Sequence, residues 1–127
     1  MGLRSKFVPD SDIARLLVDA GFRGESAIVA FCIVIAESGG DTWAINMNTH
    51  APEADTYLSL DKGLVQFNDY WWPIAQSSDA FVPELAIAEF FVASKEGTDF
   101  QPWVAYKNFS FVRHVERAYD SFANIIF

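Results

Sequence analysis

Cysteine is nearly missing from this sequence: Cys32 is the single one among 127 residues, so no disulfide can form within the chain. It stands in the apolar stretch Ala30-Phe31-Cys32-Ile33-Val34. That context predicts a small buried side chain, because a reactive thiolate needs an electropositive, partly exposed setting. We therefore expect an apolar core to hold the fold, as is usual for proteins of a reducing compartment.

Positive charge is also scarce, with nine Lys and Arg against 17 Asp and Glu and a net charge of −8. An acidic surface repels nucleic acids and anionic membranes, so neither is expected as a partner. The two histidines, His50 and His114, have no ligand spacing and no cysteine partners, so no metal site and no cofactor are predicted.

Long apolar runs are absent too. The longest, from Ala27 to Ala36, is far shorter than the ~20 residues that span a bilayer. The first residues, Met1 to Lys6, carry two positive charges without a following apolar stretch, which does not resemble a secretory signal. We therefore expect synthesis in a cytoplasm without a signal peptide.

Apolar and aromatic residues are plentiful, at 51% and 16% of the chain. The length suits one domain over residues 1–127, and no linker or repeat divides it. Helical patterns at both ends enclose a polar, turn-rich segment, Thr42 to Asn68, that is typical of two or three short strands. The expected class is α+β, mainly helical with a small antiparallel sheet.

The most apolar predicted helix runs from Ser26 to about Ser38 and should lie at the centre of the core, although a buried strand is an alternative. Gly39 and Gly40 should end it. A last helix is predicted to begin at Ser110. Its expected buried residues are Val112, Val115, Ala118, Tyr119, Phe122, Ile125 and Ile126.

Glu37 follows the apolar run of the central helix. A carboxyl at the end of a buried helix is partly desolvated, and the partial negative charge of a helix C-terminus acts in the same direction, so both should raise its pKa. A raised pKa suits a general acid. The alternative is a solvated glutamate at a fraying helix end.

Asp61 lies in the polar segment before Gly63. Asn48, Asn68 and Ser59 are candidate donors that would keep its carboxylate ionised. Alone, it could be an ordinary turn aspartate. Together with Glu37 it forms a pair of carboxyls in contrasting environments, which is what cleavage of a glycosidic bond requires.

These segments resemble the chicken-type lysozymes and, more broadly, the lysozyme-like superfamily. The resemblance rests on Glu37-Ser38, then Ala44-x-Asn46-x-Asn48-Thr49, then Asp61-x-Gly63-Leu64-x-Gln66-x-Asn68-x-x-Trp71-Trp72, and on Trp103 to Asn108. It implies the lysozyme-like fold, with the small sheet forming one wall of a cleft. Lysozyme is also the type case of the two-carboxyl mechanism.

The resemblance implies catalytic roles for two residues. Glu37 would be the general acid and base, and Asp61 the nucleophile or electrostatic stabiliser. Asn48 and Asn68 would hydrogen-bond Asp61.

For the substrate, the resemblance places Gln66 in the cleft beside the reacting sugar. Trp71 and Trp72 would contact sugars, and Trp103 would pack near Glu37 and raise its pKa. Core packing is the alternative for each tryptophan.

The chain departs from the family in having no disulfides, in its acidity and in a longer segment around His50 to Tyr57. The soluble lytic transglycosylases share the Glu-Ser and Gly-Leu-x-Gln elements but lack the aspartate, so cleavage by Glu37 alone is one alternative. A non-catalytic glycan-binding or structural module of a phage particle is another.

The expected activity is that of a muramidase, which hydrolyses the β-1,4 bond between N-acetylmuramic acid and N-acetylglucosamine. The expected partners are peptidoglycan glycan strands and, in a virion, other phage or tail proteins. A phage-encoded endolysin or virion component, made in the bacterial cytoplasm and acting on the cell wall, fits the missing signal and disulfides.

Overall fold

The computed structural model describes residues 5–50 and 57–127. Its helical elements and its strands follow one another in the order that the sequence predicts. They are α1 (Asp10–Ala20), α2 (Gly24–Ser38), β1 (Ile45–His50), β2 (Tyr57–Lys62), β3 (Phe67–Asn68), η1 (Pro73–Gln76), η2 (Ser78–Phe81), α3 (Pro83–Ala93), α4 (Val104–Lys107), η3 (Ser110–His114) and α5 (Val115–Ser121). The α+β class with helix dominating is confirmed.

The central element is α2, which is a helix and not the alternative strand. Its residues are buried on nearly every side, including Phe31 and Ile33 at 0% exposure, because α1, α4, η3 and α5 all pack against it. Cys32 is fully buried here, and burial raises the pKa of its thiol to about 11. Gly39 ends the helix in the left-handed conformation, at φ 65°, which glycine adopts without steric cost.

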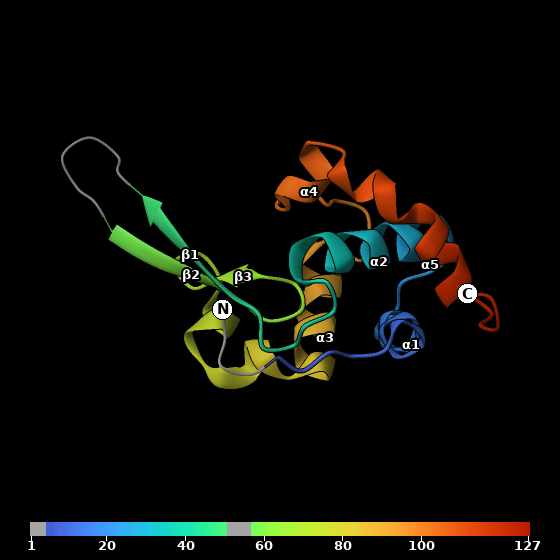
Figure 1. The fold of residues 1–127 in the computed structure, drawn as a ribbon, viewed down its shortest axis with the longest axis horizontal. Helices are drawn as coiled ribbons and strands as arrows, with labels where there is room; N and C mark the ends of the chain where they lie inside the picture. Colours follow the sequence, from blue (N-terminus) through green and yellow to red (C-terminus); the bar gives the residue numbers. More distant parts are fainter. Residues whose placement is uncertain (1–4, 51–56) are drawn as a thin grey trace.

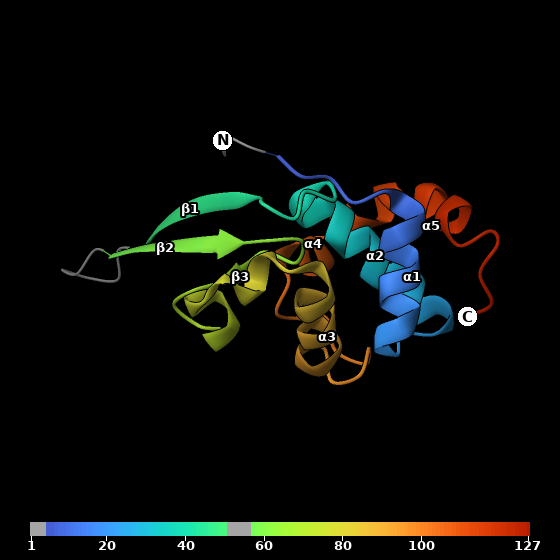
Figure 2. The same cartoon turned by 90° about the horizontal axis from the view of Figure 1, so that it is seen from below.

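The three strands form an antiparallel sheet in the order β1-β2-β3. Asn46 lies opposite Asp61, and Asn48 lies opposite Ser59. Because paired residues share a face, this face of the sheet is polar, and the other carries Ile45, Met47 and Leu58, which are exposed. Figures 1 and 2 show the β1–β2 hairpin projecting from one side of the helices, with α1 and α5 on the other.

Gly63 makes the turn after β2 possible. It has φ 81°, and a Cβ atom at this position would overlap the carbonyl oxygen of Ala80. This close approach places η2 against the end of the sheet. The next two residues, Leu64 and Val65, are fully buried. The sheet is thereby held next to the helical core.

The C-terminal region differs from the prediction of one continuous helix. Ser110 starts the 3-10 helix η3 without acting as a side-chain cap, and α5 begins only at Val115. Of the predicted buried residues, Ala118 and Phe122 are buried, whereas Val112, Tyr119 and Ile126 are 53%, 55% and 98% exposed. A 3-10 turn has three residues per turn rather than 3.6, so the single helical pattern loses its register.

The longer segment that the sequence places around His50 to Tyr57 lies largely outside the described residues. Where the chain is described, no helix is long and apolar enough to cross a membrane.

Candidate active site

Glu37 is the last residue but one of α2 and is partly buried. Burial raises its pKa from 4.5 to about 6, and the negative charge of Asp61 adds to the increase. A backbone hydrogen bond from Ala105 opposes these two effects. Glu37 therefore holds its proton at a pH where an ordinary glutamate has lost it, as expected from its place at the end of a buried helix.

Asp61 lies on β2, on the polar face of the sheet, and both of its oxygens accept side-chain amides. Asn48 Nδ2 donates to Oδ2 at 2.8 Å, and Asn68 Nδ2 donates to Oδ1 at 2.8 Å. The predicted hydrogen bonds from these two asparagines are thus confirmed. Amide donors stabilise the charged form of a carboxyl group.

The two carboxyls differ in the way that acid-base chemistry needs. Glu37 is desolvated at a helix terminus, whereas Asp61 lies on a strand and accepts hydrogen bonds from two side-chain amides. Asp61 lies close enough to Glu37 for its negative charge to raise the pKa of Glu37. A proton donor beside an ionised carboxylate is the arrangement that cleaves glycosidic bonds.

Asn68 connects Asp61 to its surroundings. The same Nδ2 donates to the buried Ser59 Oγ at 2.8 Å, and Oδ1 accepts the backbone N–H of Tyr70 at 2.9 Å. Every polar atom of the Asn68 side chain is therefore engaged. This fixes the Asp61 carboxylate relative to the sheet and to the start of the Tyr70-Trp71-Trp72 segment.

Gln66 is buried, at 8% exposure, and adopts φ 58° in the turn between β2 and β3. Its Nε2 donates to the carbonyl oxygens of Ala44 and Gly63, at 3.1 and 2.9 Å, and its Oε1 accepts Asn46 Nδ2 at 2.6 Å. These contacts give Gln66 a structural part in the sheet turn. Direct contact with a sugar stays a prediction.

The three predicted tryptophans lie in different settings. Trp71 is 66% exposed and meets the ring of Tyr70 edge to face at 4.7 Å. Trp72 is half-buried and stacks on Trp103, with 6.2 Å between the ring centres. Trp103 is 5% exposed and donates from Nε1 to the carbonyl oxygen of Val65 at 3.2 Å. Trp71 is thus the one best placed to meet a ligand.

Trp103 also packs against aromatic residues of the hydrophobic core. Its ring packs against Phe67, Phe90 and Phe100, and it precedes α4, which supplies the backbone of Ala105 to Glu37. The expected contribution of Trp103 to the apolar surroundings of Glu37 stays a prediction.

Sequence reasoning missed two participants. The backbone of Ala105 has no side-chain signature, so only the fold could reveal its contact with Glu37. Tyr70 also takes part, because its backbone N–H donates to Asn68 Oδ1, a contact that no side-chain pattern predicts.

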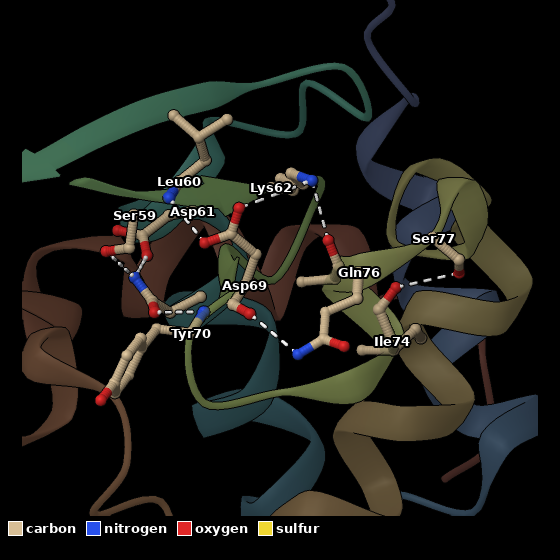
Figure 3. A network of polar contacts seen from close by, with 11 residues as sticks. Ser59, Leu60, Asp61, Lys62, Asp69, Tyr70, Ile74, Gln76 and Ser77 are labelled. Atoms are coloured by element: carbon tan, nitrogen blue, oxygen red, sulfur yellow. Dashed lines mark hydrogen bonds and ion pairs between the residues drawn. The ribbon is translucent and has the colours of Figure 1, made fainter. Parts of the chain in front are cut away.

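Lys62 and Asp69 connect strand β2 to the segment that follows the sheet. Lys62 Nζ donates to the carbonyl oxygen of Ala75 at 2.8 Å and lies 3.8 Å from Asp69 Oδ2. Asp69 Oδ1 accepts the N–H of Leu60 at 2.9 Å (Figure 3). This network anchors η1, and the tryptophan segment before it, to β2.

Within residues 5–50 and 57–127, no group of three His, Cys, Asp or Glu side chains is arranged to hold a metal ion.

No curated protein and no solved structure matches the chain. A protein-family model does match: the lysozyme-like domain, over residues 14–105. The match runs from α1 to α4 and contains both carboxyls and the whole sheet. Lysozyme-like domains degrade peptidoglycan as glycosidases or transglycosylases. The chain belongs to the lysozyme-like domain family.

Proposed function

We propose that this protein is a muramidase that hydrolyses the β-1,4 bond between N-acetylmuramic acid and N-acetylglucosamine. Glu37 protonates the leaving oxygen as the bond breaks, and Asp61 traps or stabilises the glycosyl centre. Glu37, now ionised, then takes a proton from water as the water attacks that centre. Glu37 regains its proton and Asp61 its free carboxylate.

The observation that carries this proposal is the binding of Asp61 by two amides within electrostatic reach of Glu37. A lytic transglycosylase needs the acid alone, and an aspartate held in this way would then have no task. Retention of configuration requires carboxyls about 5 Å apart. The negative charge of Asp61 acts on Glu37, as the two-carboxyl mechanism requires.

Peptidoglycan is itself anionic, and the chain carries a net charge of −8. Long-range attraction is therefore absent, so affinity must come from short-range contacts, with the exposed ring of Trp71 as the leading sugar contact. A phage endolysin or virion component remains the predicted setting for such an enzyme.

The test is mass spectrometry of the fragments released from purified peptidoglycan by the wild-type protein, Glu37→Gln and Asp61→Asn. Reducing muramic ends made by the wild-type protein, and by neither variant, are expected. Anhydro-muramic ends that persist in Asp61→Asn would replace the proposal with a transglycosylase. No release by folded wild-type protein would leave a binding or structural module.

A further inference from the structure

A groove between α1 and the C-terminal helix α5 gathers positive charge in a chain that has little of it. It contains three of the nine Lys and Arg residues: Arg15 from α1, Arg113 from η3 and Arg117 from α5. Its volume of about 720 Å³ lies within the range of binding sites for small ligands. Figures 1 and 2 show α1 and α5 on the side of the helices away from the β1–β2 hairpin, so the groove is separate from the candidate active site.

Arg117 already has a carboxylate partner in the groove. Its Nε donates to Asp10 Oδ2 at 2.7 Å, and its Nη2 donates to Asp10 Oδ1 at 2.9 Å. This bidentate pair joins α5 to the first turn of α1, and the hydrogen bonds from Arg117 to Asp10 raise the pKa of the guanidinium. The pair therefore holds the two walls of the groove together.

The other charged side chains of the groove are not paired. Arg15 and Arg113 are exposed, and within the described part of the chain neither forms a hydrogen bond or an ion pair through its side chain. Glu116 and Asp120 on α5 are exposed too, and their carboxylates likewise have no such partner among the described residues. The groove thus presents two guanidinium groups and two carboxylates to a ligand.

The positive charges of the groove act together at a neighbouring side chain, His114. Burial lowers the pKa of His114 first, and the charges of Arg117 and Arg113 lower it further. The two guanidinium groups therefore lie close enough for both to attract one anion bound beside them. A chain of net charge −8 keeps a local positive region here.

A ligand that satisfies both kinds of unpaired group carries carboxylates and an ammonium group. Guanidinium groups bind carboxylates with paired hydrogen bonds, and Glu116 and Asp120 suit an ammonium group. Asn124 adds an amide for a peptide backbone, and the half-buried Ile125 adds apolar surface for methylene groups. The short peptides of peptidoglycan combine free carboxylates with the ammonium group of a diamino acid. An N-acetylated glycan strand has no ammonium group.

We propose that this groove is a second wall-binding site, and that it holds the peptide stem of peptidoglycan. Arg15 and Arg113 bind the stem carboxylates, and Glu116 and Asp120 bind its ammonium group. The inference rests on the function proposed above, which supplies the polymer. Because the groove lies away from the carboxyl pair, a stem bound there leaves the active site open to a glycan strand. Two contacts with one network raise the effective concentration of the protein at an anionic wall.

The test is an NMR titration with an N-acetylated stem tetrapeptide that carries two carboxylates and one lysine ammonium group. The wild-type protein should bind it, and the pKa of His114 should rise in the complex, because bound carboxylates offset the charges of Arg113 and Arg117. Arg15→Gln and Arg113→Gln should each raise Kd roughly two- to five-fold, as expected for exposed ion pairs. Glu116→Gln should raise Kd for this peptide and not for the same peptide acetylated on its lysine.

Lys95→Gln is the matched control for net charge. Lys95 is exposed after α3 and outside the groove, so this variant removes one positive charge and should keep the wild-type Kd. A rise in Kd equal to that of Arg113→Gln would mean that net charge alone drives binding, and the groove would be wrong. A peptide with both carboxylates amidated should not bind; equal binding would also overturn the proposal.

This titration needs no bond cleavage, so it separates the groove from the proposed function. Peptide binding that Arg15→Gln/Arg113→Gln loses supports the groove, whether or not the wild-type protein releases muramic ends. A protein that releases reducing muramic ends and binds no stem peptide would overturn the groove and leave the muramidase standing. The double variant should also cleave whole peptidoglycan more slowly than wild type and peptide-free glycan strands equally fast. An equal loss on both substrates would contradict a peptide site.

Discussion

Glu37 and Asp61 lie in contrasting surroundings: burial favours the neutral form of Glu37, whereas the Asp61 carboxyl accepts hydrogen bonds from two asparagine amides. The charge of Asp61 also favours the neutral form of Glu37. Burial and this charge together raise the pKa of Glu37 to about 6. These contrasting surroundings suit the proton-donor and carboxylate roles that we propose for Glu37 and Asp61.

Activity should fall on the alkaline side with an apparent pKa near 6, because the proposed first step needs a protonated Glu37 with a pKa of about 6. The measurement is kcat/KM for soluble glycan strands from pH 4 to 9. A rate that stays flat through pH 8 would show that Glu37 is not the acid.

Stability should depend on the same group, with a definite sign. The folded pKa of about 6 exceeds the ordinary 4.5, so the contribution of Glu37 is complete below pH 4.5 and is lost as the pH rises through 6. Glu37→Gln cannot ionise and should be more stable than wild type above pH 6, by up to about 2 kcal/mol. The two proteins should converge below pH 4.5.

Chemical denaturation at pH 4, 6 and 8 measures this difference. Glu25→Gln, an exposed change in the first turn of the same helix, controls for the loss of one negative charge. A Glu37→Gln advantage that is equal at all three pH values would contradict the assignment of the titration to Glu37.

Asn48→Ala should lower kcat roughly ten-fold or more, since a hydrogen bond to a charged group contributes about 1.5–3 kcal/mol. Asn46→Ala is the matched control: it removes one amide from the same strand and face, but its partner is Gln66 rather than Asp61. Steady-state kinetics should separate the two variants. Equal loss of kcat in both would mean that the effect is structural.

Trp71 and Trp103 should respond in opposite ways to substitution by alanine. Trp103→Ala should cost about 3–5 kcal/mol of unfolding free energy, because a buried ring and its hydrogen bond to Val65 are lost. Trp71→Ala should change stability by less than about 0.5 kcal/mol and raise KM, since the ring is exposed. Denaturation curves and KM values for both variants check this. A stable Trp103→Ala protein would contradict its place in the core.

Much of the site could be predicted because its chemistry is local in sequence. The apolar run before Glu37 indicated a buried helix, and Gly39 marked its end. The polar residues around Asp61 indicated its amide donors. The C-terminal helix could not be predicted in this way. Phe109 enters the left-handed region and η3 interrupts the period, so Val112 and Tyr119 turned outward.

The sequence by itself determined the helix that carries Glu37, the strand that carries Asp61, and the residue types around them, because periodicity, turn residues and charge act over short distances. Only the tertiary structure decided that Ala105 hydrogen-bonds Glu37, that the Gln66 amide is satisfied within the sheet turn, and that Trp71 is exposed while Trp103 is buried. These outcomes depend on contacts between segments far apart in the chain, and such contacts form only when the sheet and the helices pack together.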